Sequence, residues 1–144
     1  MTTVYDIESI AGVLTEEEGY RRFSYEDHLG YTTVGVGRCI ERGVGYGIDE
    51  EEAQYLLKRD IARICVSCSE RFSSFWGDLS PNIRETIILL VFQLGLSGYC
   101  LFKNHLAAVR GGDWAAAAHH LLDSKFAKQT PARAERMADR IRRG

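Results

Sequence analysis

The chain is 144 residues long, the size of one domain with a substantial hydrophobic core. Hydrophobic residues make up 45% of it and charged residues 26%, as is typical of soluble globular proteins, and a formal net charge of −2 argues against a surface built for nucleic acids. The start of the chain lacks a secretory leader and no apolar run approaches the length of a membrane span, so we expect a protein made in the cytoplasm.

The first segment, residues 1–18, has apolar residues at helical spacing that predict a helix over 3–17. This helix ends in three acids, of which Glu18 is the last, followed by Gly19. The helix macrodipole disfavours negative charge at a carboxyl end by ~0.3–1 kcal/mol for each acid. Acids at a position that disfavours negative charge are a mild indication of a functional site.

A small β lobe is expected over residues 19–48. Residues 20–25 and 31–36 are rich in aromatic and β-branched side chains and flank a turn at 27–30, which predicts a hairpin. Residues 43–47 form a loop or a short third strand.

Two glycines, Gly35 and Gly37, leave one face of the second predicted strand without side chains. Glycine in a strand often marks a bend or a place where another group approaches the backbone closely. We expect one of these two features here.

A long connecting helix is predicted over residues 49–71, because Asp49 and Glu52 resemble a capping box and an apolar stripe follows them. The remaining segment, residues 80–144, reads as a helical lobe. Its first helix begins at Ser80-Pro81 and is apolar nearly all round, which predicts a central buried helix. Shorter helices are expected at 103–110, at 114–123 with Asp113 as N-cap, and at 131–143 with Thr130 as N-cap.

The predicted fold is therefore α+β. A small N-terminal lobe with a β-hairpin or three-stranded sheet is joined by a long helix to a helical C-terminal lobe, within a single domain spanning residues 1–144.

Two acids nine residues apart, Glu18 and Asp27, flank the first predicted strand. Hydrolysis of a glycosidic bond needs two carboxyl groups, one to protonate the leaving oxygen and one to activate water or attack the sugar. Taken alone, such acids are more often solvated or structural, and Thr33 in an alternating strand is by default a β-former.

Gln93 is a polar amide within an apolar helix, where an unpaired buried amide costs ~1–3 kcal/mol. It must find partners or face a cleft. Arg133 falls in a first helical turn, which the macrodipole does not favour, so an acidic partner is expected for it.

The four cysteines are expected to be free thiols, since Cys65 and Cys68 lie too far apart on one helix for an unstrained disulfide. The histidines show no spacing typical of zinc ligands, and we expect neither a metal nor a cofactor.

Residues 125–144 carry seven basic and two acidic side chains, a net charge of +5. This basic C-terminal helix is either a solvated face or a contact for an anionic partner. Its apolar stripe is thin for membrane insertion.

The spacing of several residues resembles the active-site signature of the phage T4-type lysozymes, the endolysins that cut bacterial peptidoglycan: Glu18-Gly19-x5-Tyr25-x-Asp27-x2-Gly30-x2-Thr33-x-Gly35-x-Gly37. Val91-Phe92-Gln93-Leu94-Gly95 and Gln129-Thr130-Pro131-x-Arg133 resemble two further segments of that family, in the same order.

The resemblance implies a lysozyme-like fold and a catalytic role for three residues. Glu18 would be the general acid, Asp27 the carboxylate that activates water for inversion, and Thr33 a residue that positions this water. From the residues alone, inversion and retention both stay open, because the separation of the carboxylates decides between them.

The resemblance also implies supporting residues. Phe92 and Gln93 would line the substrate cleft, and Arg133 would pair with Glu18. The family often has a histidine where this chain has Arg38, and this histidine pairs with an aspartate whose position matches Asp60. We therefore expect an Arg38–Asp60 ion pair without a histidine's titration near neutral pH.

A second departure is Leu29, an acid in the best-known member, which puts a third cleft carboxylate in doubt. The leading hypothesis is a muramidase that cleaves the β-1,4 bond between N-acetylmuramic acid and N-acetylglucosamine, acts as a monomer and needs a holin for access to the wall. A peptidoglycan-binding module with decayed catalysis and a membrane-active protein are the alternatives, and intact Glu18, Asp27 and Thr33 argue against decay.

Overall fold

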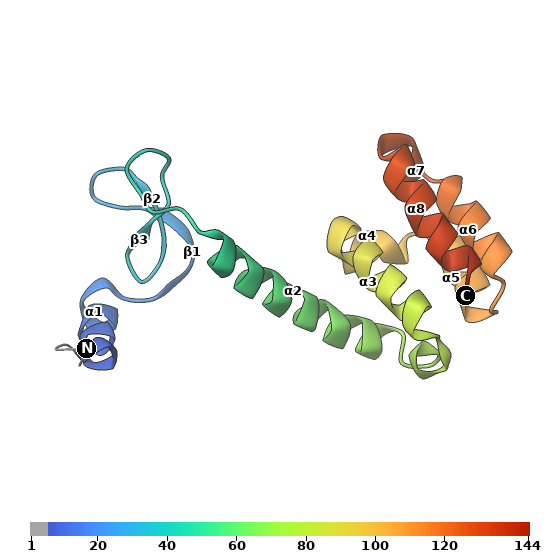
Figure 1. The fold of residues 1–144 in the computed structure, drawn as a ribbon, viewed down its shortest axis with the longest axis horizontal. Helices are drawn as coiled ribbons and strands as arrows, with labels where there is room; N and C mark the ends of the chain where they lie inside the picture. The colour runs from blue at the N-terminus through green and yellow to red at the C-terminus, as the bar shows by residue number, and fades with distance from the viewer. Residues whose placement is uncertain (1–5) are drawn as a thin grey trace. The chain divides into compact units, whose positions relative to one another are not determined.

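The computed structural model describes residues 6–144 and divides into two compact units. The first ends at Gln54, and the second runs from Tyr55 to Gly144. A three-stranded antiparallel sheet precedes a long helix and a helical C-terminal region (Figure 1), so the α+β prediction is confirmed.

The first unit contains one helix, the sheet and the first turn of the long helix. Its elements are α1 (Ile7–Glu18), β1 (Arg21–Glu26), β2 (Thr32–Gly35), β3 (Arg38–Cys39) and the start of α2 (Glu50–Arg71). The strands follow one another in the order β1-β2-β3, with both pairs antiparallel, and β1 has a bulge between Arg21 and Tyr25.

The structure refines two predictions for this unit. The first helix was expected over 3–17, and α1 covers Ile7–Glu18, while residues 3–5 of that prediction lie outside the described residues. Residues 43–47 were expected to form a loop or a short third strand; they form a loop, and the short third strand is residues 38–39. Gly43 and Gly47 have positive φ angles, which place this segment in turns instead of a strand.

Thr33 is the one buried residue among residues 6–54, so the first unit has almost no hydrophobic core. Hydrogen bonds and an ion pair stabilise it instead. The predicted capping box at the start of α2 is confirmed: the Glu52 amide donates to Asp49 Oδ1 at 2.8 Å, and the Asp49 amide donates to Glu52 Oε2 at 2.8 Å. Arg38 adds a bond from Nη2 to the same Glu52 oxygen, which ties β3 to the start of α2.

The second unit is helical. After the rest of α2 it contains η1 (Trp76–Asp78), α3 (Pro81–Leu94), α4 (Leu96–Cys100), α5 (Lys103–Arg110), α6 (Trp114–Leu122), α7 (Lys125–Gln129) and α8 (Pro131–Arg142). The four helices that the sequence predicts in this region are present, and η1, α4 and α7 were not predicted.

Side-chain N-caps mark the start of three of these helices, α3, α6 and α7. Ser80 accepts from the Ile83 amide at the start of α3, and Asp113 accepts from the Ala116 amide at the start of α6. Thr130 occupies the N-cap position of α8 but makes no capping bond, and its hydroxyl instead donates to the Phe126 carbonyl in α7. The expected capping role of its side chain is therefore wrong.

A contiguous hydrophobic core fills the second unit. It includes Ile83, Ile87 and Leu90 of α3, each 1% exposed, as the prediction of a central buried helix requires. Burial of a side chain of this size stabilises the fold by about 1.5–3 kcal/mol. The opposite face of α3 reaches solvent, since Phe92 is 47% exposed.

A chain of two hydrogen bonds between buried polar groups crosses this core. The Tyr99 hydroxyl donates to Nε2 of His105 at 2.9 Å, and His105 Nδ1 donates to the Ala117 carbonyl at 2.8 Å. Burial lowers the pKa of His105, so the imidazole stays neutral with its proton on Nδ1.

The four cysteines are free thiols, as predicted. Burial raises the pKa of Cys68 to about 11, which makes that thiol unreactive. Among residues 6–144, no helix is both long enough and apolar enough to cross a membrane.

Candidate active site

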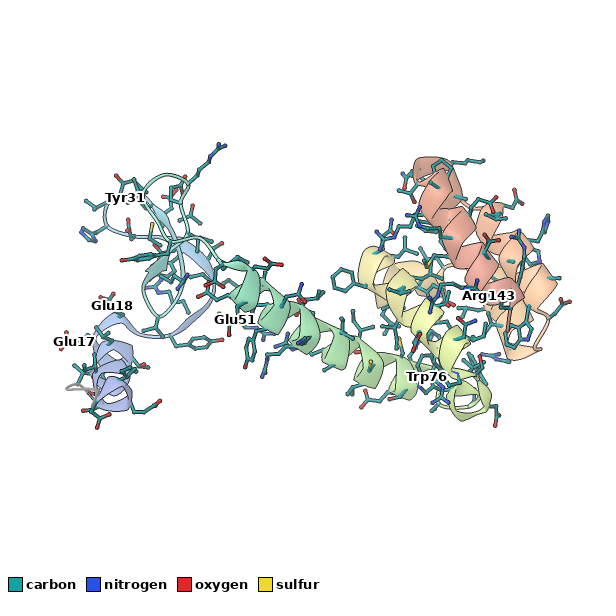
Figure 2. The ribbon with its side chains drawn as sticks, viewed as in Figure 1. Glu17, Glu18, Tyr31, Glu51, Trp76 and Arg143 are labelled. Atoms are coloured by element: carbon teal, nitrogen blue, oxygen red, sulfur yellow. The ribbon has the colours of Figure 1, made fainter. Side chains whose placement is uncertain are left out.

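Glu18 is the last residue of α1, and Figure 2 shows it with Glu17 at the carboxyl end of this helix. Asp6 caps the start of α1 by accepting from the Ser9 amide, and Gly19 ends it with φ +71° and a bond from its amide to the Thr15 carbonyl. The helix thus presents Glu18 at a fixed, solvent-exposed end.

The Glu18 carboxyl group lies against the backbone of Gly37. A Cβ atom placed on Gly37 would lie 3.1 Å from both Cδ and Oε2 of Glu18. The sequence predicted a bend or a close approach at Gly35 or Gly37, and the structure shows the approaching group at Gly37 to be Glu18 itself. Gly37 is a site residue that the sequence analysis did not assign.

Asp27 is held by a tight turn between β1 and β2. Its Oδ1 atom accepts from the amides of Leu29 and Tyr31, both at 2.9 Å, and Gly30 closes the turn with φ +82°. This pattern, an aspartate that bonds the backbone two residues on, is common in turns. Among residues 6–54 no group bonds Asp27 Oδ2, so one carboxylate oxygen is fixed and the other is available.

Thr33 is on β2, the middle strand, where it pairs with Tyr25 of β1 and Cys39 of β3. The residue is 3% exposed, and its hydroxyl donates to the Tyr31 carbonyl at 3.0 Å. The hydroxyl proton is therefore committed to the backbone, and the oxygen lone pairs remain as acceptors.

The three residues with predicted catalytic roles and Arg38 all belong to the first unit. The other predicted residues, Asp60, Phe92, Gln93 and Arg133, belong to the second unit.

Phe92 and Gln93 are adjacent near the end of α3. The Phe92 ring is half exposed, and the buried Gln93 Oε1 atom has no hydrogen-bond partner within the second unit. The sequence predicted that the Gln93 amide either has hydrogen-bond partners or faces a cleft. Its oxygen has no partner within the second unit. A buried acceptor without a partner is costly and is uncommon in folded proteins.

The two members of the expected Arg38–Asp60 pair each have another partner. Arg38 Nη2 lies 3.0 Å from Glu52 Oε2, and Asp60 Oδ1 lies 2.9 Å from Nη1 of Arg63. Arg38 Nε also donates to the Gly47 carbonyl at 2.9 Å. The Arg38–Asp60 pair stays a prediction, whereas Glu52 is a partner that the sequence analysis missed.

Arg133 lies in the first turn of α8 and is half-buried. Within the second unit it forms no ion pair. Its expected pairing with Glu18 also stays a prediction.

No group of three or more His, Cys, Asp or Glu side chains in the described part of the chain is arranged to hold a metal ion. The three candidate catalytic residues of the first unit supply two carboxyl groups and a hydroxyl that can accept a hydrogen bond. This set suits proton transfer and the orientation of water.

Comparison with known proteins gives the site a context. A model of the family described as phage lysozyme matches residues 15–140. The chain is 28% identical to a probable T4-type lysozyme 1 from Dictyostelium discoideum over 96% of both chains, and 26% identical to an endolysin of Acyrthosiphon pisum secondary endosymbiont phage 1 over 77% of this chain and 73% of that one. It is also 28% identical to the pre-baseplate central spike protein Gp5 of Enterobacteria phage T4, where the match covers 90% of this chain and 27% of the spike protein.

Proposed function

The chain belongs to the phage lysozyme family, and we propose that it hydrolyses the β-1,4 bond between N-acetylmuramic acid and N-acetylglucosamine in bacterial peptidoglycan. Family membership supports a peptidoglycan-hydrolysing lysozyme, and the bond is our assignment. The observation that carries it is the pair of carboxyl groups in the first unit, one against Gly37 and one fixed by a turn.

Glu18 acts as the general acid in this proposal. It lies at the exposed end of a helix, where a leaving glycosidic oxygen can reach it. Its proton passes to that oxygen as the bond to the anomeric carbon breaks.

Asp27 acts on the attacking water. The two amide bonds hold Oδ1, so Oδ2 is free to take a proton from this water. Thr33 has an acceptor oxygen that orients the same water. A water between carboxylate and sugar inverts the anomeric carbon, so we propose an inverting enzyme, and the anomer of the first-formed product tests this point.

The second unit supplies substrate contacts and electrostatic support. Phe92 offers a half-exposed ring to a sugar face, and the neighbouring Gln93 is proposed to line the substrate cleft beside it. We propose that Arg133 is the ion-pair partner of Glu18 in the absence of substrate. We propose that both units act together as one lysozyme-like domain over residues 1–144, released to the wall by a partner of holin type in host cell lysis.

The basic face of α8 is proposed to contact anionic envelope polymers. At about 100° per residue, Arg133, Arg136, Arg140 and Arg143 fall within a sector of roughly 80°. Arg140 is bound to α3 through Thr86 and Glu85, whereas Arg136 and Arg143 are exposed and form no ion pair within the second unit (Figure 2 labels Arg143).

Arg142 provides the matched control for this surface. It is on another face of α8 and pairs with Asp139 at 2.6 Å. In an inactive Glu18→Gln chain, removal of the Arg136 and Arg143 side chains is expected to weaken binding to purified sacculi at low salt. Arg142→Gln in the same chain is expected to leave this binding unchanged. Equal effects of these changes would contradict a role for the exposed arginines.

The main test is wall hydrolysis by Glu18→Gln beside Glu17→Gln, a neighbouring acid on the same helix. With outer-membrane-stripped Gram-negative cells, we expect the wild type and Glu17→Gln to clear the suspension and Glu18→Gln to lose at least about 100-fold in rate. Circular dichroism controls for folding. Retained lysis by a folded Glu18→Gln protein would overturn the proposal.

A further inference from the structure

The turn between β2 and β3, residues Val36 and Gly37, lies so close to Glu18 that a side chain on Gly37 would be crowded. A Cβ atom on Gly37 would lie 3.1 Å from Glu18 Cδ and Oε2 and 3.2 Å from Cγ. At such distances one of the two groups must give way by a few tenths of an ångström. The contact joins the end of α1 to the sheet.

Backbone conformation alone does not explain this glycine. Gly35 and Gly37 have almost equal φ angles, +70° and +65°, so both occupy the left-handed region that favours glycine. A Cβ atom on Gly35 would meet nothing within 4 Å. The two positions therefore differ in their neighbour, not in their strain.

The position of the Glu18 carboxyl group depends on this surface. Among residues 6–54, Glu18 has no hydrogen-bond or ion-pair partner. Contact with the Gly37 backbone is what limits where the carboxyl group can lie on this side. A displaced Gly37 or an added methyl group would move the carboxyl group directly.

Arg38, the next residue, holds the turn in place. Its guanidinium group donates to the Gly47 carbonyl at 2.9 Å and to Glu52 Oε2 at 3.0 Å, and the same Glu52 oxygen accepts from the Asp49 amide. β3 has only two residues, and these bonds of Arg38 attach it to Gly47 and Glu52. They connect the turn to the first turn of α2.

We propose that Gly37 is a positioning residue for Glu18, with Arg38 as the anchor of the turn that carries it. The absence of a side chain at Gly37 lets the carboxyl group lie where it meets the leaving oxygen. This inference rests on the proposed function of Glu18, because a carboxyl group that transferred no proton would need no such position.

The kinetic test compares Gly37→Ala with Gly35→Ala on purified peptidoglycan. Both variants place alanine at a positive φ and bear the same kind of strain. Misplacement of a reacting group by 1 Å costs up to ~100-fold, and the carboxyl group must move by a few tenths of an ångström, so we expect Gly37→Ala to lower kcat about three- to fivefold with KM within about twofold. Gly35→Ala is expected to keep kcat within about twofold. Equal kcat values for the two variants would overturn the inference.

A stability cycle tests the contact without any activity. Gly37→Ala is expected to lower Tm more than Gly35→Ala, and a prior Glu18→Ala change is expected to remove this excess because the crowded atoms are gone. An undiminished excess in the Glu18→Ala background would overturn the contact. An inactive wild type with an intact cycle would instead contradict the proposed function and with it the positioning role.

Discussion

The two units of this chain are stabilised by different means. The second buries a contiguous core around α3, with Ile83, Ile87 and Leu90 almost fully covered. The first buries only Thr33 among its described residues and relies on hydrogen bonds of Asp27, Arg38 and Glu52. The acids proposed to act on the substrate thus belong to the unit with little core, where backbone turns fix their positions.

The largest expected effect is on the core of the second unit. Leu90→Ala is expected to lower the free energy of unfolding by about 2–5 kcal/mol, because it removes buried methyl groups and leaves a cavity. Trp76 and Trp114 are both in this unit, so tryptophan fluorescence during urea unfolding reports on it. Leu101→Ala, at a side chain 75% exposed, is the control, and an equal loss in both variants would contradict the difference between core and surface.

The next effect is on activity and leaves the core untouched. Asp27→Asn keeps an oxygen that accepts from Leu29 and Tyr31 but removes the charge. We expect peptidoglycan hydrolysis to fall about 100-fold, equivalent to roughly 2.7 kcal/mol of transition-state stabilisation, with Tm unchanged. Glu26→Gln, at the exposed neighbouring acid, is the control. Equal activities of the two variants would remove Asp27 from the mechanism.

A smaller effect depends on pH and belongs to the second unit. Burial lowers the pKa of His105 in the folded state, so below about pH 6.5 the unfolded chain binds more protons than the folded one. The charge of His120 also disfavours protonation of His105. Lys103 and Asp123 line the same surface pocket as these two histidines. Stability of the second unit is therefore expected to fall as pH drops through 6.5 toward the lowered pKa.

His105→Gln is expected to flatten this pH dependence in urea unfolding followed by tryptophan fluorescence. His119→Gln, at an exposed histidine on α6, is expected to leave it as in the wild type. A wild-type slope that persists in His105→Gln would assign the effect to another group.

The smallest expected effect concerns the polar support of the first unit. The Arg38 and Glu52 side chains are 38% and 40% exposed, so solvent screening limits their coupling energy to about 0.2–1 kcal/mol. A double-mutant cycle read by amide hydrogen exchange in β2 and β3 measures it. The i,i+3 pair Asp60–Arg63 is the control, and a cycle energy for Arg38–Glu52 of zero would contradict its anchoring role.

The sequence predicts the helices well where a local signal starts them. Ser80 before Pro81 and the Asp49–Glu52 box mark α3 and α2, because a cap involves residues only three apart. The sequence left loop and strand open for residues 43–47, because glycines at 43 and 47 are consistent with either, and it did not indicate the two-residue strand at 38–39.

The candidate site is predictable in its residues but not in its contacts. The pattern around Glu18 and Asp27 carries a family signature, whereas the atom that faces each carboxyl group depends on how distant segments meet. Gly37 is nineteen positions beyond Glu18, and no local rule pairs them. Glu52 is fourteen residues beyond Arg38, and no local rule predicts that pair either.

The chemical identity of the cut end tests the central claim most directly. Purified sacculi are digested with the wild-type protein, the fragments are reduced with borohydride, and the reduced sugar is identified by mass spectrometry. The account predicts N-acetylmuramitol at the reduced end, and none above background with Glu18→Gln. N-acetylglucosaminitol, an anhydro sugar, or release of peptides without a new reducing end would contradict it.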